Sequence, residues 1–178
     1  MDILVTLLAA ALLSVERLTY RYAWKRPGRF AARVRRTRFL RTSDPVQGLR
    51  SLFVGFKLIQ VGVLLGWCMW FGRTWLPLPE APPVAITAGV TLIVIGQILN
   101  ASVMHRLGNE GVFYGNRFGR DIPWQTGFPF SLVAHPQYLG ALASVWGFML
   151  AMRFPNPDWV VVPLISTVYY AAGARLER

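Results

Sequence analysis

The stretch VAITAGVTLIVIGQILNASVM, residues 84–104, decides the class of fold. It contains no charged side chain, and its most polar groups are the amides of Gln97 and Asn100. A helix of about 20 apolar residues is long enough to cross the hydrocarbon core of a bilayer. The stretch therefore predicts a membrane-spanning helix whose amides face the interior of a helical bundle.

Four more apolar segments surround this helix, at residues 3–22, 49–71, 138–154 and 159–174. The first two are long enough to span a bilayer, whereas the last two are shorter and are joined by a Pro-Asn-Pro turn signal at 155–157. We therefore expect an all-α integral membrane bundle of about five hydrophobic helices. The last two form a short hairpin, and residues 1–178 form a single domain.

The composition supports membrane insertion and locates the charge. Apolar residues make up 54% of the chain, and the mean hydropathy is +0.40. Of the 19 Lys and Arg residues, 11 lie between Arg17 and Arg50. A basic segment beside a membrane helix is typical of binding to anionic lipid headgroups. No soluble basic module is present, so we expect no nucleic-acid partner.

The distribution of cations also predicts an orientation. If the Arg17–Arg50 segment is cytoplasmic, the loop 105–134 and the C-terminus lie on the same side. Only Arg73 and Arg153 then face outward, which agrees with the excess of Lys and Arg in cytoplasmic loops. The expected location is a bacterial inner membrane or the endoplasmic reticulum, with the site facing the cytoplasm.

Three glycines recur every fourth residue in the 105–134 loop, at Gly111, Gly115 and Gly119. On a helix they would form one smooth stripe, suited either to helix packing or to the close approach of a cofactor. Gly62 and Gly66 have the same spacing, which we attribute to helix packing. The spacing alone leaves both interpretations of the loop glycines open.

The motif HPQYLG at 135–140 opens the fourth apolar segment. Pro136 suits the first position of a helix. His135 is then either a polar residue at the start of that helix or an imidazole aimed at an anion or hydroxyl, with Tyr138 on the same face. The single cysteine, Cys68, lies in an apolar run, and no Cys cluster predicts a metal site.

Three elements together resemble the membrane-embedded phospholipid N-methyltransferases. They are RLGNEGVFYGNRFG (106–119), TGFPFSLVAHPQYLG (126–140) and a terminal apolar span followed by Glu177. The HPxYxG element is shared with the wider superfamily of isoprenylcysteine carboxyl methyltransferases. The resemblance implies cytosolic S-adenosyl-L-methionine as cofactor. It assigns cofactor binding to Gly96, Gly108, Gly111, His135, Pro136, Tyr138, Gly140 and Glu177.

Two positions depart from the family pattern. Val94 replaces the first glycine of a Gly-x-Gly element, and Arg178 replaces the second acid of a terminal glutamate pair. The expected reaction is methylation of phosphatidylethanolamine, or of its monomethyl and dimethyl derivatives, toward phosphatidylcholine. The alternatives are methylation of a small thiol or an isoprenylcysteine carboxylate, or a non-catalytic membrane scaffold.

The mechanism suggests roles for individual residues. A lipid amine must lose a proton before it attacks, and Glu177 and His135 are the expected bases. Arg117 and Arg120 are expected to hold the lipid phosphate. Trp124 and Phe128, like Tyr138, are expected to face the sulfonium or the methylated ammonium.

Overall fold

A computed structural model of the chain describes residues 2–73, 75–155 and 157–176. Every regular element within these ranges is a helix, which confirms the all-α prediction. Five long helices make up the bundle: α1 (Ile3–Lys25), α3 (Pro45–Gly72), α4 (Pro83–Val112), α5 (Pro136–Ala151) and α6 (Val161–Leu176). The shorter elements are α2 (Pro27–Arg36) and the 3₁₀ turns η1 (Arg38–Leu40), η2 (Gly115–Phe118) and η3 (Pro157–Val160).

The helices begin where the sequence supplies caps and prolines. The Asp2 carboxylate accepts hydrogen bonds from Leu4 N and Val5 N at 3.0 and 3.3 Å, and Asp44 accepts one from Val46 N at 3.1 Å. Such caps satisfy backbone donors that have no partner within the first turn. Helices α3, α4 and α5 each start on a proline, whose fixed φ suits the first helical position.

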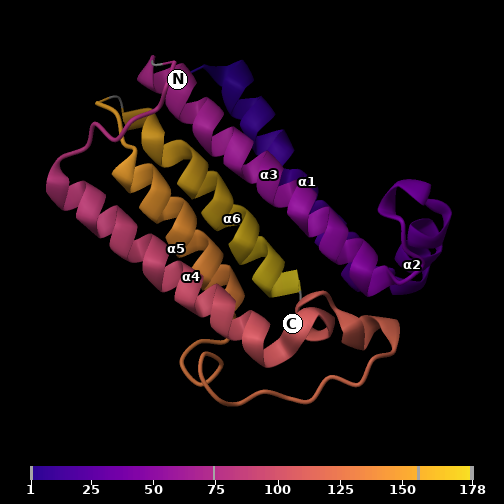
Figure 1. Cartoon of the computed structure of the whole chain (residues 1–178). Helices are drawn as coiled ribbons and strands as arrows, with labels where there is room; N and C mark the ends of the chain where they lie inside the picture. The colour runs from indigo at the N-terminus through magenta and orange to yellow at the C-terminus, as the bar shows by residue number, and fades with distance from the viewer. Residues whose placement is uncertain (1, 74, 156, 177–178) are drawn as a thin grey trace.

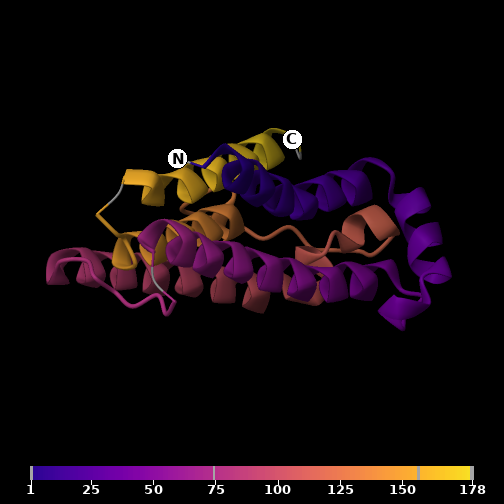
Figure 2. The same ribbon diagram turned by 90° about the horizontal axis from the view of Figure 1, so that it is seen from above.

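The helices alternate in direction, and one end of the bundle gathers the polar segments. Figure 1 shows α5 between α4 and α6, with α1 beside α3. Helix α2, the loop after α4 and the end of α6 lie at the same end. The view from above also places α5 between α4 and α6, with α1 and α6 on one side of the bundle and α4 on the other (Figure 2).

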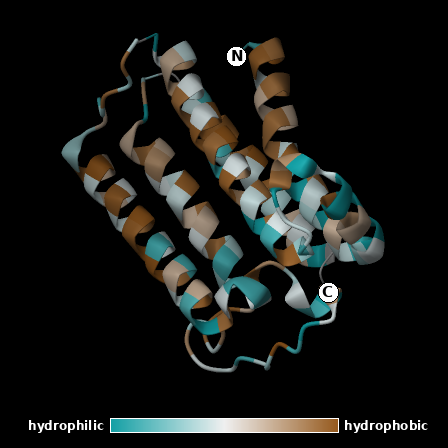
Figure 3. Cartoon of the chain, turned by 45° about the vertical axis from the view of Figure 1, so that its right-hand side comes forward, coloured by the Kyte–Doolittle hydropathy of each residue, from teal (hydrophilic) through white to brown (hydrophobic). Residues whose placement is uncertain are grey.

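Three helices, α1, α3 and α4, are long and apolar enough to cross a membrane. Only 22%, 28% and 17% of their most apolar windows are buried inside the protein. The outward apolar surface therefore remains for lipid. Figure 3, coloured by residue hydropathy, shows brown residues along the helices and more teal at the polar end. Helices α5 and α6 have 16 residues each, as expected for a shorter terminal pair.

Two apolar clusters hold the bundle together. One surrounds Trp67, Met149 and Val162 and joins α3, α5 and α6. The other contains Phe30, Leu49 and Phe113 and fixes α2 and the loop after α4 against α3. Helix α2 lies within the basic segment, and no helix was expected there. Its Phe30 and Val34 are buried on one face, and four arginines remain exposed.

Candidate functional site

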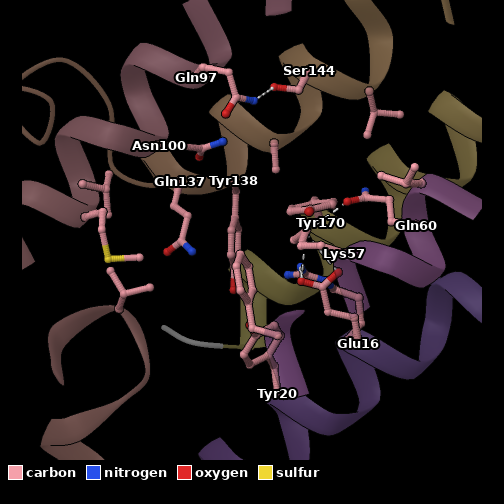
Figure 4. A pocket seen from close by; sticks show the side chains of 18 of the residues that line it. Glu16, Tyr20, Lys57, Gln60, Gln97, Asn100, Gln137, Tyr138, Ser144 and Tyr170 are labelled. Carbon is pink, nitrogen blue, oxygen red and sulfur yellow. Dashed lines mark hydrogen bonds and ion pairs between the residues drawn. The ribbon is translucent and has the colours of Figure 1, made fainter. Parts of the chain in front are cut away.

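A cavity of about 500 Å³ lies inside the bundle, between α3 on one side and α4 and α5 on the other. Helices α1 and α6 complete its walls. Its volume is typical of a small-molecule binding site. Figure 4 shows polar side chains from several helices converging on it. Gln97 and Asn100, the two amides expected in the bundle interior, both line it, as do Lys57 and Gln60 of α3.

Amides form one wall of the cavity, which we call the amide wall: Gln97, Asn100 and Gln137, with Ser144 beside them. Gln97 Nε2 donates to Ser144 Oγ at 2.8 Å, and that hydroxyl donates to the carbonyl of Gly140 at 2.9 Å. Asn100 Oδ1 is buried without a hydrogen-bond partner among the described residues. A buried polar atom without a partner costs free energy, so a donor that reached this oxygen would be bound favourably.

The opposite wall carries charge, and we call Glu16, Arg17, Lys57 and Gln60 the charged wall. Arg17 Nη2 lies 2.8 Å from Glu16 Oε1, and Lys57 Nζ lies 3.3 Å from Glu16 Oε2. Lys57 Nζ also donates to Gln60 Oε1 at 3.0 Å. Ionisable groups inside a membrane bundle are costly, so their presence marks a functional site.

Tyrosine rings separate the two walls. Tyr138 stands between the amides and the charges in Figure 4, and its ring meets that of Tyr170 edge to face at 5.4 Å. Tyr170 is 5% exposed, and its hydroxyl has no partner among the described residues. Electron-rich ring faces of this kind attract sulfonium and ammonium groups.

The HPQYLG motif builds the beginning of α5. The His135 carbonyl accepts hydrogen bonds from the backbone amides of Tyr138 and Leu139, both at 3.1 Å, and Pro136 occupies the first turn. The His135 ring stacks on Tyr138, with centroids 5.7 Å apart and planes 18° from parallel. Among the described residues, Tyr138 lines the cavity, whereas His135 supports it from behind.

Gly96 and Gly140 face each other where α4 crosses α5. A Cβ added at Gly96 would collide with the carbonyl oxygen of Gly140, and one added at Gly140 would lie 2.6 Å from Asn100 Oδ1. The two glycines bring the helices together and place Asn100 on the cavity. A direct contact between either glycine and a cofactor stays a prediction.

The three glycines of the loop do not lie on one helix, so they form no continuous stripe. Helix α4 is broken at Gly108, which has φ +61°, ψ −173°. Gly111 follows in the last turn of α4, Gly115 starts η2, and Gly119 follows η2 with φ +82°. A positive φ is readily adopted by glycine but strained in other residues, and it breaks the 3.6-residue period that the stripe requires.

Helix packing within the described part of the chain does not explain the spacing of Gly62 and Gly66. A Cβ at either position would meet nothing within 4 Å among the described residues. Both glycines are exposed on α3. Their spacing on an apolar surface matched the pattern of an interface, but α3 turns this face away from the bundle.

The four expected substrate contacts lie away from the lining of the cavity. Arg117 Cζ lies 3.7 Å from the centroid of the Trp24 ring, and Arg120 faces Asp44 and Glu110 at 3.6 and 3.8 Å. Trp124 is 91% exposed and Phe128 is 43% exposed. Glu177 lies outside the described residues, so its predicted role stays untested.

The charged wall was the main feature that sequence reasoning missed. Arg17 was counted in the basic segment expected at lipid headgroups and Glu16 was given no role, although Glu16 is 7% exposed. The available signal was an acid and a base within an apolar span, facing a second span that holds Lys57. Opposite charges in two neighbouring spans are expected to pair inside the bundle.

Comparison with known proteins identifies the family. A sequence model described as phospholipid methyltransferase matches residues 84–178, a segment that contains α4, α5 and α6. This match covers more than half of the chain. The protein belongs to the phospholipid methyltransferase family, as the sequence motifs indicated.

Three curated relatives agree with this assignment. The chain is 48% identical over 54 residues to a phosphatidyl-N-methylethanolamine N-methyltransferase of Arabidopsis thaliana, covering 30% of this chain and 33% of that protein. It is 34% identical over 91 residues to the Saccharomyces cerevisiae protein of that name, covering 51% and 43%. It is 28% identical over 97 residues to human phosphatidylethanolamine N-methyltransferase, covering 54% and 48%.

The chain thus matches less than half the length of each of these relatives. No solved structure matches it. The family assignment therefore depends on α4–α6, whereas α1, α2 and α3 precede the matched segment.

Proposed function

We propose that the protein transfers methyl groups from S-adenosyl-L-methionine to the amine of a membrane phospholipid. The expected substrates are phosphatidylethanolamine and its monomethyl and dimethyl derivatives. The observation that carries this proposal is the polar cavity inside an apolar bundle. One of its walls is built by the helices that match the phospholipid methyltransferase family.

The residues of the amide wall suit the cofactor. Asn100 Oδ1 and the Tyr170 hydroxyl are buried and have no partners among the described residues, and the cofactor carries amines and ribose hydroxyls that can pair with them. Tyr138 offers a ring to a sulfonium. Glu177, which follows α6 in the sequence, remains a proposed contact for the cofactor's ammonium. When bound, the cofactor supplies an activated methyl group on a cationic sulfur.

The chain's own task in this reaction is to orient the reactants and to exclude water. Methyl transfer requires the amine nitrogen and the methyl carbon to meet in line, and fixed side chains supply that alignment. The stack of His135 on Tyr138 and the edge contact of Tyr138 with Tyr170 hold the central ring in place. His135 remains the proposed acceptor of the amine proton, a role that requires its imidazole to move from behind the Tyr138 ring to within hydrogen-bond reach of the amine.

The proposed topology is multi-pass, with the site open to the cytoplasmic side. The loop after α4, α2 and the end of α6 lie at one end of the bundle, which supports a shared side (Figure 1). The basic segment is proposed to contact anionic headgroups there.

A methyl-transfer assay tests the function. Membranes that contain the protein are supplied with methyl-labelled S-adenosyl-L-methionine, and the extracted lipids are resolved. Label in mono-, di- or trimethylated phosphatidylethanolamine supports the proposal and counts the steps. Label that appears only in a thiol or a carboxyl ester would contradict the lipid amine as substrate. Membranes without the protein serve as the control.

A further inference from the structure

The charged wall lies outside the segment that matches the family. Glu16 and Arg17 belong to α1 and Lys57 to α3, whereas the match begins at residue 84. These residues nevertheless line the same cavity as the amide wall. Helices α1 and α3 thus contribute part of a site whose remaining lining lies in the segment that matches the family.

The charges on this wall do not balance. The described lining of the cavity contains one carboxylate, Glu16, and two cations, Arg17 and Lys57. Both cations contact that carboxylate, at 2.8 and 3.3 Å. The wall therefore carries one excess positive charge in an environment of low dielectric, where an anion would be bound favourably.

The two cations differ in their freedom to move. The Arg17 guanidinium lies over the Tyr170 ring at 4.0 Å and over Tyr20 and Tyr138 at 5.3 Å each, and its side chain is 12% exposed. Lys57 is 32% exposed, and its flexible stem ends at the cavity. Lys57 is therefore the cation best placed to reach a ligand, while Arg17 supports the carboxylate.

Tyr138 lies between the two walls, within reach of a headgroup whose phosphate is bound at the charged wall. In a phosphoethanolamine headgroup, two carbons separate the amine from the phosphodiester. A phosphate on the charged wall would place its amine near Tyr138, which stands between the walls (Figure 4). The amide wall, proposed to hold the methyl donor, faces the same cavity, so the amine and the methyl group would meet beside that ring and not across it.

We infer that Lys57, supported by Glu16, Arg17 and Gln60, forms the subsite for the phosphodiester of the lipid substrate. This inference rests on the proposed function, because it takes a phospholipid as the substrate. It locates headgroup recognition on α1 and α3, away from Arg117 and Arg120. Lys57 then contributes to lipid affinity, and the residues of the amide wall align the methyl donor.

Binding measured without the methyl donor tests the inference. Calorimetry on the purified full chain in a non-ionic detergent compares dihexanoylphosphatidylethanolamine with dihexanoylglycerol, which lacks the phosphoethanolamine headgroup. Lys57→Met should weaken phospholipid binding about tenfold, the value of one charge-assisted hydrogen bond, and leave dihexanoylglycerol binding unchanged. Lys57→Arg, which keeps the charge, should retain most of the affinity. Arg73→Met removes an exposed cation beyond the far end of α3 and should match the wild type.

Two outcomes would overturn the subsite: equal binding of both ligands by the wild type, or unchanged phospholipid binding in Lys57→Met. Parallel methyl-transfer assays separate the two proposals. If the wild type binds phospholipid and Lys57→Met weakens that binding, but no methyl group is transferred, the proposed function is contradicted and the subsite stands. If Lys57→Met shows normal turnover with an unchanged KM for lipid, the subsite is contradicted and the proposed function stands.

Discussion

Gly96 occupies a position where a single methyl group has no room. A Cβ there would collide with the Gly140 carbonyl and lie 2.6 Å from Ser144 Oγ. The backbones of α4 and α5 would have to separate, and Ser144 is also the acceptor for Gln97. Tight packing at this position therefore controls the geometry of the amide wall.

We expect Gly96→Ala to destabilise the protein by about 1–3 kcal/mol, the usual cost of overpacking a core. Gly62→Ala is the matched control, because it makes the same change in another apolar helix where the added atom meets nothing within 4 Å. Thermal unfolding in detergent, followed by tryptophan fluorescence, measures both variants. Equal melting temperatures would contradict the close contact between α4 and α5.

Glu16 is the acid that holds two cations inside the bundle. Glu16→Ala leaves Arg17 and Lys57 without their carboxylate, and breaking a buried ion pair in this way costs about 3 kcal/mol. Removing Lys57 as well relieves part of this cost, so Glu16→Ala/Lys57→Met should be more stable than Glu16→Ala alone. Urea unfolding of the four proteins in a double-mutant cycle measures the coupling. A coupling energy near zero would show that the two side chains do not interact.

At the scale of elements, the five apolar segments were predictable because each carries a continuous hydrophobic signal. Helix α2 was missed because its many arginines make the segment polar on average. Only Phe30 and Val34, four residues apart, carry the helical apolar pattern. The cavity was harder to predict. Its pairs, such as Glu16 with Lys57 and Gln97 with Ser144, are 41 and 47 residues apart in sequence, and periodicity within one segment says nothing about such contacts.

Helix α2 presents Arg29, Arg33, Arg35 and Arg36 to the outside while Phe30 and Val34 anchor it. Replacing the four arginines with glutamine should reduce the enrichment of phosphatidylserine around the protein, since each cation near an anionic surface contributes about 1 kcal/mol. Native mass spectrometry of lipids retained from mixed nanodiscs measures the enrichment. Arg73→Gln/Arg153→Gln, at the opposite end of the bundle, is the control. Unchanged enrichment in the four-arginine variant would contradict lipid binding by α2.

On the scale of the whole molecule, the bundle has one polar end and one end formed by the connector before α4. If the chain crosses the membrane as proposed, both Gly28 in α2 and Trp124 in the loop after α4 face the same compartment. In a Cys68→Ser background, Gly28→Cys and Trp124→Cys should react with an impermeant maleimide from one side. Glu80→Cys, in the connector, should react only from the other. Labelling of Gly28→Cys and Trp124→Cys from opposite sides would overturn the topology.

The helix pairs are packed very unequally, and this difference has a mechanical consequence. Helix α4 is locked to α5 through facing glycines, but it touches α3 only lightly across the cavity. Thermal motion of the bundle should therefore be largest where α3 faces α4 across the cavity, because the cluster around Trp67, Met149 and Val162 still holds α3 to α5 and α6. In the proposed reaction, motion between α3 and α4 would let a diacyl lipid enter sideways from the bilayer, while the facing glycines keep α4 and α5 in register.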